Sequence, residues 1–372
     1  MPRVVIVSGT RPEVVKLAPV FAALQKFPGF QTEWLSTGQH REMLDQAEAV
    51  FGITPDVDLD LMKENQSPLE VVADISHALQ KQWATEKPDF VVVQGDTATT
   101  FAAALTAFYL RIPVGHVEAG LRSYNSQEPF PEEAHRRMIA PLSTLHFPPT
   151  AMAQRNLLVE NFEFQHIHNV GNTVVDALLS IPDAADFTIG KDIDPHKRWV
   201  LVTAHRRENH EQLKNVCAAL KKIRDMNDDI EIVFPVHLNP NVRKVVTCEL
   251  QNQERIHLLD PMGYFDFVQL MRRSALILTD SGGIQEEAPT YKIPTLVLRR
   301  QTERPEAVNA GMAKLVGTDM RTIVDSANEL LQNTEAYELM RKGENPFGDG
   351  QSGQRIAEII DKFLAESSAS CC

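Results

Sequence analysis

The stretch Thr-Asp-Ser-Gly-Gly-Ile-Gln-Glu-Glu-Ala-Pro at residues 279–289 follows an apolar run, Ala275 to Leu278, that is typical of a buried strand. Its composition favours a helix up to the break at Pro289. Two glycines at a strand-to-helix turn let an oxyanion approach the backbone, and the N–H groups of the first helical turn point toward it. Glu287, one turn further on, is suited to accept hydrogen bonds from ribose hydroxyls. Taken alone, the stretch fits an anion-binding turn and a ligand-free tight turn equally well.

The same order of strand, loop and helix recurs along the chain. Short apolar runs predict strands at residues 4–7, 32–36, 90–93, 113–117, 200–203, 231–236, 276–279 and 294–298. Helical stretches separate most of these strands, which implies right-handed crossovers and mostly parallel sheets. The order restarts near Arg198, after a polar, proline-containing stretch. We therefore expect an α/β protein with two doubly wound domains, residues 1–170 and 171–350, and a C-terminal segment, 351–372, that begins with a helix.

Composition limits the class of protein. The chain has 372 residues, more than one hydrophobic core usually serves, so two domains are expected on length as well. Charged residues make up 23% and hydrophobic residues 43%, which is typical of a soluble globular protein. The net charge of −13 argues against nucleic acid or an anionic membrane as the main partner. A phosphate-bearing ligand is therefore expected to meet a local cluster of Arg, Lys, His and backbone N–H groups.

The N-terminus and the cysteines predict a cytoplasmic protein. No apolar run approaches the roughly 20 residues of a membrane span, and the first residues lead directly into a strand, without a signal peptide. Cys217 and Cys248 stand alone, and Cys371-Cys372 ends a Ser/Ala-rich tail. Neither spacing resembles a zinc or disulfide framework, so we expect a reducing compartment. For the terminal pair we expect a frayed tail rather than lipidation or redox chemistry.

Polar side chains follow the predicted strands. Arg11, Asp96, Glu118, His205 and Ser281 each come just after a strand-like run. In open parallel sheets, ligands bind beyond the carboxyl ends of the strands. Two domains that present such ends to each other would enclose a cleft that holds carboxyls, a histidine and an anion site.

Some of these residues, and the nearby acids Glu132 and Glu133, also have a simpler structural interpretation. Asp96 fits a plain helix N-cap, whereas Glu118 is a poor N-cap and lies on a Gly-containing turn. Glu132 and Glu133 open a predicted helix, where acids complement the dipole, and one of the two fits that role alone. His205 has no partner at metal-ligand spacing, which leaves contact with a leaving diphosphate or a buried structural role. Crowded carboxyls repel each other, so at least one tends to hold a proton near neutrality, as an enzyme that takes and returns a proton requires.

A set of short motifs, in order along residues 3–320, resembles the non-hydrolysing UDP-N-acetylglucosamine 2-epimerases. No single motif is specific, but the set is. Its members are Gly9-Thr10-Arg11-Pro12-Glu13 with Lys16, Thr37-Gly38-Gln39-His40-Arg41, Gln94-Gly95-Asp96-Thr97, His116 to Arg122, Pro131-Glu132-Glu133, Gly171-Asn172-Thr173, His205 to Asn209, residues 279–289 and Thr302 to Glu306.

The resemblance implies a glycosyltransferase-B-like architecture of two Rossmann-type domains, with the site between them and a C-terminal helix that crosses back to the first domain. It implies a cytoplasmic homodimer in polysaccharide biosynthesis that acts on a UDP-sugar without NAD or metal. In the implied reaction, UDP leaves C1 as the C2 proton is removed, and a 2-acetamidoglucal stays bound. Reprotonation on the opposite face and re-addition of UDP then give UDP-N-acetylmannosamine.

Carried over position by position, the resemblance also implies roles for individual residues. The acid/base carboxyls, and the histidine that assists at the diphosphate, are Asp96, Glu118, Glu132 and His205. The residues that bind the nucleotide, phosphates and sugar are Arg11, Lys16, Phe267, Ser281, Gly282, Gly283, Glu287 and Arg304, with Glu287 on the ribose. Which carboxyl is the C2 base stays open.

The chain departs from the family pattern at a few positions. His135 stands where Asn is usual, in the helix that carries Glu132, and Ala204 stands where Gly is usual. In the pocket where bacterial members bind a second UDP-GlcNAc as activator, the matching positions are Gln39, His40 and His237, but Glu42 replaces Gln and Asn65 replaces Arg. An acidic group replaces a neutral one and a cation is lost, so we expect allosteric activation to be weakened or absent.

Three other interpretations remain at this point. The same chemistry could act on a modified UDP-2-acetamido sugar, such as a 2,3-diacetamido sugar or its uronate. A UDP-sugar glycosyltransferase shares the fold and the nucleotide turn, but it needs an acceptor pocket and not three carboxyls at C2. A sugar-nucleotide-binding regulator without turnover would tolerate loss of Asp96 or Glu118, and both are present.

Overall fold

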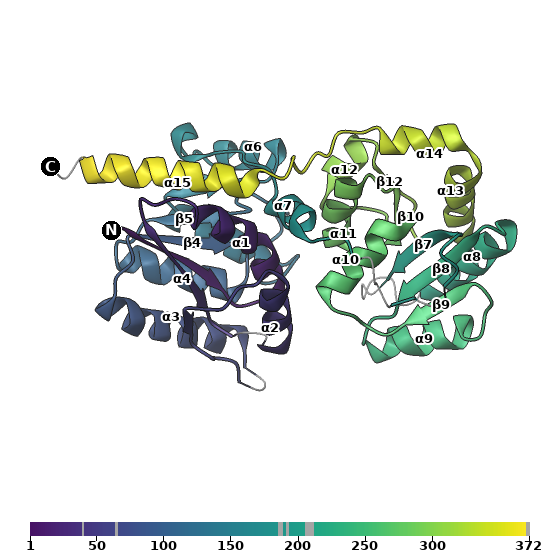
Figure 1. Ribbon diagram of the computed structural model, residues 1–372, viewed down its shortest axis with the longest axis horizontal. Coiled ribbons are helices and arrows are strands. Elements are labelled where there is room, and N and C mark those ends of the chain that lie inside the picture. Colours follow the sequence, from purple (N-terminus) through teal and green to yellow (C-terminus); the bar gives the residue numbers. More distant parts are fainter. Residues whose placement is uncertain (39–40, 64–65, 185–188, 191–192, 205–211, 370–372) are drawn as a thin grey trace. The chain divides into compact units, whose positions relative to one another are not determined.

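The chain folds into two compact units, shown in Figure 1. The computed structural model describes residues 1–38, 41–63, 66–184, 189–190, 193–204 and 212–369, with only the backbone for 41–43 and 368–369. Unit 1 comprises Met1–Ile181 and Phe347–Cys372, and unit 2 comprises Pro182–Pro346. Each unit is built around a six-stranded sheet, and all strand pairs within the two sheets are parallel. The predicted α/β class with two doubly wound sheets is confirmed.

The two sheets have the same topology. In unit 1 the strand order is β3 (Val57–Asp58), β2 (Gln31–Ser36), β1 (Arg3–Ser8), β4 (Phe90–Gln94), β5 (Val114–Val117), β6 (Leu145–Phe147). In unit 2 it is β12 (Ala313–Leu315), β11 (Thr295–Val297), β10 (Ser274–Thr279), β7 (Arg198–Thr203), β8 (Ile230–Pro235), β9 (Ile256–Leu259). In both, the chain starts in the middle of the sheet, builds one half, and then crosses over to build the other. This crossover creates a topological switch point between β1 and β4, and another between β7 and β10.

The strands that the sequence predicts are all present, and those that it misses lie at the edges of the sheets. β3, β6, β9 and β12 end the two strand orders. These strands are short, and β3, β6 and β12 have only two or three residues each. A short edge strand needs no long apolar run, because it contacts a neighbour on one side only. Periodicity alone therefore detects the central strands and misses the outer ones.

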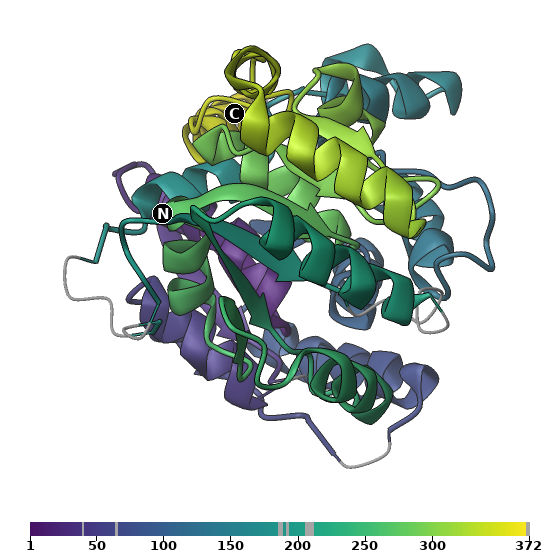
Figure 2. The same cartoon turned by 90° about the vertical axis from the view of Figure 1, so that its right-hand side faces the viewer.

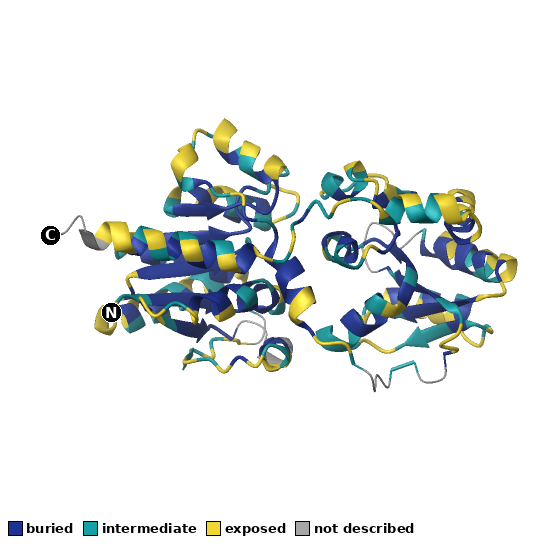
Figure 3. Cartoon of the chain, turned by 45° about the horizontal axis from the view of Figure 1, so that its top comes forward, coloured by how far each residue is buried: buried dark blue, intermediate teal, exposed yellow. Residues whose placement is uncertain are grey.

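Alternate residues of the unit 1 strands face opposite layers of helices. Val4 and Ile6 lie in a core cluster with α1 (Arg11–Leu24), α2 (Arg41–Val50) and α15 (Ser352–Ala369). Val5 and Val7 lie in a second cluster with α3 (Pro68–Thr85), α4 (Ala98–Tyr109) and α5 (Glu132–Ile139). The period of two explains why both faces of this sheet are apolar. Figure 3 shows the strands buried and α15 buried along one side only.

Unit 2 is layered in the same way. The core on one face of its sheet joins Val200, Ile232 and Leu278 to α8 (Leu213–Met226), α9 (Pro240–Leu250) and α13 (Met320–Gln332). Figure 2 turns this unit toward the viewer. The remaining helices of the chain are α6 (Ala151–Val159), α7 (Thr173–Ser180), α10 (Tyr264–Arg273), α11 (Gly282–Glu287), α12 (Pro305–Asn309) and α14 (Thr334–Arg341), with the 3-10 turns η1 (Ala140–Leu142), η2 (Phe164–His166) and η4 (Ala288–Tyr291). None of the helices in the described ranges combines the length and apolar character that crossing a membrane requires.

The C-terminal helix α15 packs on unit 1. The ring of Phe363 lies 5.5 Å from that of Phe90, and the Gly353 N–H donates to Asp176 Oδ1 of α7 at 2.8 Å. The Asn172 N–H, just before α7, donates to Phe347 O at 2.6 Å. These contacts tie α7 and α15 to the same unit. The division therefore falls at Ile181 and Phe347, whereas the sequence predicts 170 and 350.

Replacing Gly120 by alanine should destabilise unit 1 by about 2–5 kcal/mol, the sum of backbone strain and overpacking. Its φ is +85°, and a Cβ would overlap the Ala153 carbonyl oxygen and come within 3.0 Å of Leu157 Cγ. Urea unfolding measures the change. Gly52→Ala is the matched control, because Gly52 has φ +64° with nothing within 4 Å of a Cβ. It should cost only about 1–2 kcal/mol for the left-handed backbone. Equal losses in the two variants would contradict the packing argument.

Candidate functional site

The predicted polar residues that the structure describes lie just beyond the carboxyl ends of inner strands in both sheets. In unit 1, Arg11 opens α1 directly beyond β1, and Asp96 follows β4, the neighbour of β1. Glu118 follows β5, which pairs with β4. In unit 2, Ser281 follows β10, the neighbour of β7. His205 comes after β7 in sequence and lies outside the described residues. Parallel strands thus bring Arg11, Asp96 and Glu118 to one edge of one sheet.

Glu118 is held by two side chains and an unusual backbone. Lys16 Nζ lies 2.6 Å from its Oε2, and Gln94 Nε2 donates to the same oxygen. Its φ is +65°, a conformation that is uncommon for a residue with a side chain and that costs energy. The Glu118 N–H donates to Phe147 O at 3.0 Å. With the Glu118 side chain 8% exposed and that of Lys16 14% exposed, this is a largely buried ion pair whose carboxylate is fixed in direction.

Asp96 does not cap the helix that follows it. The N-cap of α4 is Thr97, whose side chain accepts from the Thr100 N–H. Asp96 Oδ2 instead receives a hydrogen bond from Arg136 Nε at 2.7 Å. His135 Nδ1 donates to the Asp96 carbonyl at 2.8 Å. The plain N-cap interpretation of Asp96 is therefore wrong, and its carboxylate is available for another role beside a guanidinium.

His135, which replaces the usual Asn, fits the site as a hydrogen-bond donor. Its ring is 6% exposed and stacks on Phe101, with centroids 5.2 Å apart and an angle of 11° between the planes. Since the Asp96 carbonyl can only accept, the Nδ1 of His135 carries the hydrogen. The substitution thus keeps a donor directed at the loop that carries Asp96.

Glu132 and Glu133 have different environments at the start of α5. Glu133 is fully buried and accepts from the Ser123 N–H at 2.9 Å and the Tyr124 N–H at 3.1 Å. It also lies 3.4 Å from Arg136 Nη1. Glu132 Oε2, by contrast, is buried and has no hydrogen-bond partner in the described part of the chain. Glu133 is the structural acid of the pair, and Glu132 is left for chemistry.

His116 supports the loop after β4. Its Nε2 lies 2.8 Å from Gly95 O, so Nε2 carries the hydrogen. Burial lowers the pKa of His116 to about 4, against a smaller opposing effect of this hydrogen bond. A neutral His116 therefore holds the backbone next to Asp96 at neutral pH.

In unit 2, a chain of hydrogen bonds orders the turn after β10. The Thr203 and Thr279 hydroxyls lie 2.6 Å apart, and Thr279 Oγ1 accepts from the Ser281 N–H at 2.9 Å. Gln285 Nε2 donates to Ser281 O at 3.0 Å, and Thr302 Oγ1 donates to Gln285 Oε1 at 2.6 Å. Residues of β7, β10, α11 and the loop between β11 and α12 thus hold the Ser-Gly-Gly turn, with Ser281 as the N-cap of α11. Gly283 is exposed, whereas Ser281 and Gly282 are half-buried.

The remaining nucleotide-binding candidates surround this turn. Arg304 Nε forms an ion pair with Glu286, which is 3% exposed. Tyr264 OH lies 3.4 Å from Glu287 Oε1. Phe267 is half-buried on α10, the helix that also carries Tyr264. Glu287, at the end of α11, is therefore half-buried beside the hydroxyl of Tyr264.

Some predicted residues are not brought together. Arg11 is half-buried, and no hydrogen bond or ion pair joins it to other described residues. Of the expected activator pocket, only His237 is described in full; it is exposed, and its Nδ1 accepts from the Asn239 N–H at 3.1 Å. The residues Gln39, His40 and Asn65, and the side chain of Glu42, lie outside the described residues.

Sequence reasoning missed the residues that hold the candidate side chains. Arg136 pairs with Asp96, Gln94 donates to Glu118, and Glu286 pairs with Arg304. Gln94 and Glu286 lie within motifs already singled out, each next to or near a predicted residue. Their spacing gave the signal, but only the fold shows which side chains meet.

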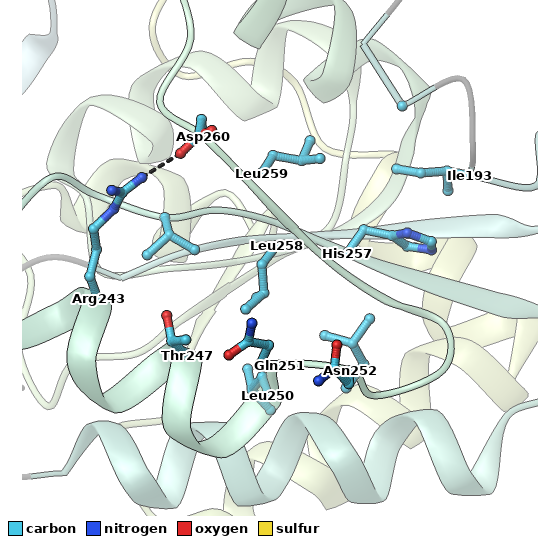
Figure 4. Close-up of a pocket in the computed structure, with 13 residues that line it drawn as sticks. Ile193, Arg243, Thr247, Leu250, Gln251, Asn252, His257, Leu258, Leu259 and Asp260 are labelled. Atoms are coloured by element: carbon cyan, nitrogen blue, oxygen red, sulfur yellow. Dashed lines mark hydrogen bonds and ion pairs between the residues drawn. The ribbon is translucent and has the colours of Figure 1, made fainter.

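Two further features of the described residues bear on the kind of site. They contain no group of three or more His, Cys, Asp or Glu side chains placed to hold a metal ion. A cavity of about 570 Å³ lies between α9 and β9. Its wall includes His257, Thr247 and an ion pair between Arg243 and Asp260 (Figure 4). Among the described residues, none of those predicted from the strand ends lines this cavity.

Comparison with known proteins identifies the family. The profile described as UDP-N-acetylglucosamine 2-epimerase matches residues 22–361. The UDP-N-acetylglucosamine 2-epimerase of Escherichia coli (strain K12) is 47% identical over 371 residues, covering 96% of this chain and 98% of that protein. The structure of UDP-GlcNAc 2-epimerase from Neisseria meningitidis, solved with UDP-GlcNAc bound, has a TM-score of 0.88 at 46% identity, covering 97% of this chain and 100% of that one.

A more distant likeness concerns the fold alone. The structure of the kitacinnamycin glycotransferase has a TM-score of 0.66 at 13% identity, covering 97% of this chain and 99% of that chain. It shares the two-sheet architecture, so the fold by itself does not separate an isomerase from a glycosyltransferase. The extent of the family match and the identity to curated relatives over the whole chain do separate them: this chain belongs to the UDP-N-acetylglucosamine 2-epimerase family.

Proposed function

We propose that this chain interconverts UDP-N-acetylglucosamine and UDP-N-acetylmannosamine by inverting C2. Membership of the family supports the reaction class. The observation that carries the proposal further is a set of three carboxyls in unit 1. Asp96 and Glu118 are each fixed by a cation, and Glu132 has a buried oxygen without a hydrogen-bond partner among the described residues. Inversion at an unactivated carbon requires such groups, because a proton must leave one face and return to the other.

The proposed reaction needs no oxidant. A carboxylate removes the C2 proton, the C–H electrons form the C1–C2 double bond, and the C1–O bond breaks with its electrons on UDP. The resulting 2-acetamidoglucal then takes a proton at C2 on the opposite face, and UDP oxygen attacks C1. We assign the proton transfers to Asp96, Glu118 and Glu132, and assistance at the departing diphosphate to His205. Lys16, paired with Glu118 at 2.6 Å, is placed to exchange that partner for a phosphate or sugar oxygen.

We assign nucleotide binding to unit 2. The Ser281 hydroxyl and the first-turn N–H groups of Gly282 and Gly283 suit the diphosphate, although α11 is a short helix and contributes only part of the binding. Glu287 suits the ribose hydroxyls, and Phe267 and Arg304 complete the set. Arg11 of unit 1, which has no ion pair among the described residues, suits the phosphates.

The experiment that tests the function is proton NMR of UDP-N-acetylglucosamine incubated with the protein in deuterium oxide. Appearance of UDP-N-acetylmannosamine, with solvent deuterium at C2 of both sugars, is expected. A product that keeps its C2 hydrogen would rule out the elimination route. Release of free N-acetylmannosamine and UDP would indicate a hydrolysing enzyme instead.

A modified UDP-2-acetamido sugar is the second candidate substrate. The observation that favours it is the chain's own departure at His135, which lies beside the Asp96 loop. C2 exchange with a UDP-2,3-diacetamido sugar or its uronate, and none with UDP-N-acetylglucosamine, would decide for this candidate.

Replacing Arg304 by alanine should weaken UDP binding by about 10-fold or more, because a charged hydrogen bond to phosphate contributes about 1.5–3 kcal/mol. It also leaves Glu286 buried without its cation, so unit 2 should become less stable. Isothermal titration with UDP measures the affinity. Lys314→Ala is the control, since Lys314 is 48% exposed and pairs with Glu329 on the surface. An Arg304→Ala variant with unchanged UDP affinity would exclude Arg304 from the site.

We also propose that activation by a second UDP-N-acetylglucosamine is weak or absent. Two departures from the family pattern support this proposal: Glu42 stands where Gln is usual, and Asn65 stands where Arg is usual. Together they make the charge less positive where a diphosphate would lie. Starting from pure UDP-N-acetylmannosamine, the reverse reaction should proceed at once, without a lag. An absolute requirement for added UDP-N-acetylglucosamine would contradict this.

The assembly and the compartment remain proposals as well. We propose a cytoplasmic homodimer, supported by a surface of unit 1 where Phe108 is 52% exposed and Tyr109 is 77% exposed. Exposed aromatic side chains in adjacent positions are common at protein interfaces. Sedimentation of the purified protein as a monomer at micromolar concentration would contradict the dimer.

A further inference from the structure

Glu13, in the first turn of α1, completes the capping box of that helix with Thr10 and is only 1% exposed. Its Oε2 accepts from the backbone N–H groups of Gly9 at 2.9 Å and Thr10 at 2.7 Å. Its Oε1 lies 2.6 Å from Thr97 Oγ1 and 3.0 Å from Thr100 Oγ1. The first two groups belong to the loop after β1, and the other two to the start of α4 after β4. One buried carboxyl therefore joins both sides of the unit 1 switch point.

The joined loops carry the candidate catalytic groups. Arg11 directly follows the first loop, and Asp96 directly precedes the second pair of contacts. The Thr100 hydroxyl also donates to Gln94 O at 2.6 Å, and Gln94 Nε2 donates to Glu118. Glu13 is thus one hydrogen bond away from the chain neighbours of Arg11 and Asp96, and it is connected to Glu118 through Thr100 and Gln94.

The hydrogens around Oε1 can be counted. Four oxygen–oxygen contacts link Glu13, Thr97, Thr100 and the Gln94 carbonyl, at 2.6, 3.1, 3.0 and 2.6 Å. The two hydroxyls supply two hydrogens, and the Gln94 carbonyl supplies none. A third hydrogen, on Glu13 Oε1, allows three of the four contacts to be hydrogen bonds at once: from Glu13 to Thr97, from Thr97 to Thr100, and from Thr100 to Gln94 O. The 3.0 Å contact between Thr100 Oγ1 and Glu13 Oε1 is then the one without a hydrogen. Oε2, which accepts two N–H groups, is then the carbonyl oxygen of the acid.

The absence of a nearby charged partner among the described residues also favours the protonated, neutral form of Glu13. No ion pair joins Glu13 to any described residue, and its hydrogen-bond partners are backbone N–H and hydroxyl groups, none of which carries a charge. A buried carboxylate without a cation is costly, whereas a neutral acid that makes all of its hydrogen bonds is not. Burial raises the pKa of Glu13, against the smaller lowering effect of its hydrogen bonds.

We propose that Glu13 is a positioning residue, and that as a neutral carboxylic acid with its proton on Oε1 it holds the Arg11 and Asp96 loops in register. The positioning role rests on the proposed function, because it matters only if these loops carry the reaction. The protonation state does not depend on that function.

The test compares Glu13→Gln with Glu13→Ala. Glutamine reproduces a neutral acid, with its oxygen facing the two N–H groups and its NH₂ facing the two threonines. Glu13→Gln should therefore keep kcat within about threefold, whereas Glu13→Ala should lower kcat by about 100-fold, as a displacement of about 1 Å can. UDP affinity, assigned to unit 2, should stay unchanged in both. The infrared spectrum of the wild type should contain the carbonyl band of a protonated carboxyl, which Glu13→Gln removes.

Glu33→Ala is the matched control. Glu33 is also a buried glutamate of unit 1, with 8% of its surface exposed. It lies within β2, away from the carboxyl end of that strand, and it pairs with Arg3 of the neighbouring strand β1. Its loss should lower stability without a 100-fold loss of kcat. If Glu13→Gln is as slow as Glu13→Ala, or if the infrared band is absent, the neutral acid is ruled out. If Glu13→Ala keeps wild-type kcat, positioning is ruled out. A wild type that binds UDP but produces no C2 exchange would contradict the proposed function, while the infrared comparison would still test the proton on Glu13.

Discussion

Replacing Glu118 by glutamine should lower kcat by about 10²–10⁴-fold, the range expected when an acid/base group is lost. The change keeps the shape of the side chain but removes the charge that pairs with Lys16 at 2.6 Å. The amide cannot take a proton from C2 at neutral pH, and it offers Lys16 only a neutral oxygen. UDP affinity, which we assign to unit 2, should change by less than about threefold. A selective loss of kcat at constant UDP affinity is the mark of a group that acts in the transition state.

The measurements are steady-state epimerisation and titration with UDP. Glu163→Gln is the control, because Glu163 belongs to the same unit and is 68% exposed, beside His166. It should leave both quantities unchanged. Near wild-type turnover in Glu118→Gln would remove Glu118 from the mechanism. A fall in UDP affinity as large as the fall in kcat would show that Glu118 matters for folding or binding, not for proton transfer.

The sequence predicts the central part of this fold because each central strand carries its own apolar run. Val4 to Val7 and residues 90–93 are buried on both faces, so hydrophobicity alone reveals them. The edge strands β3, β6, β9 and β12 depend on a neighbour, which no local pattern encodes. The side on which α15 packs depends on contacts such as that of Phe363 with Phe90, far apart in the sequence.

In the candidate site, too, some features follow from the local sequence and others depend on contacts between distant elements. The rule that ligands bind at the carboxyl ends of parallel strands selects Arg11, Asp96, Glu118 and Ser281 before any contact is known. It does not show that Thr97, and not Asp96, caps α4. A capping residue is decided by backbone direction at the helix start, and neighbouring Asp and Thr are both suitable in sequence. Partners such as Arg136 come from another element and follow only from the packing of α5 on α4.

Glu132 and Glu133 form the sharpest case, because adjacent and chemically identical residues should respond in opposite ways. Glu133→Ala removes a buried acceptor of two backbone N–H groups and a partner of Arg136. It should destabilise the chain by about 3–5 kcal/mol, as breaking a buried charged pair does. Glu132→Ala removes a carboxyl whose Oε2 is buried without a hydrogen bond in the described part of the chain. Because such an unmet group costs about 1–3 kcal/mol, its loss should leave stability unchanged or raise it.

For turnover, the variant expected to show the loss is Glu132→Ala, whereas for stability it is Glu133→Ala. A strained or unsatisfied group that persists in a folded protein is expected where function requires it. Glu132→Ala should therefore lower kcat by about 10²-fold or more and slow the exchange of the C2 hydrogen in deuterium oxide to a similar degree. Urea unfolding and NMR exchange on the two variants give the four values needed. If Glu132→Ala were as unstable as Glu133→Ala, Glu132 would be structural. If it kept the wild-type rate of C2 exchange, the proton would be moved by Asp96 and Glu118 alone, since Glu132 is the third carboxyl assigned to the proton transfers.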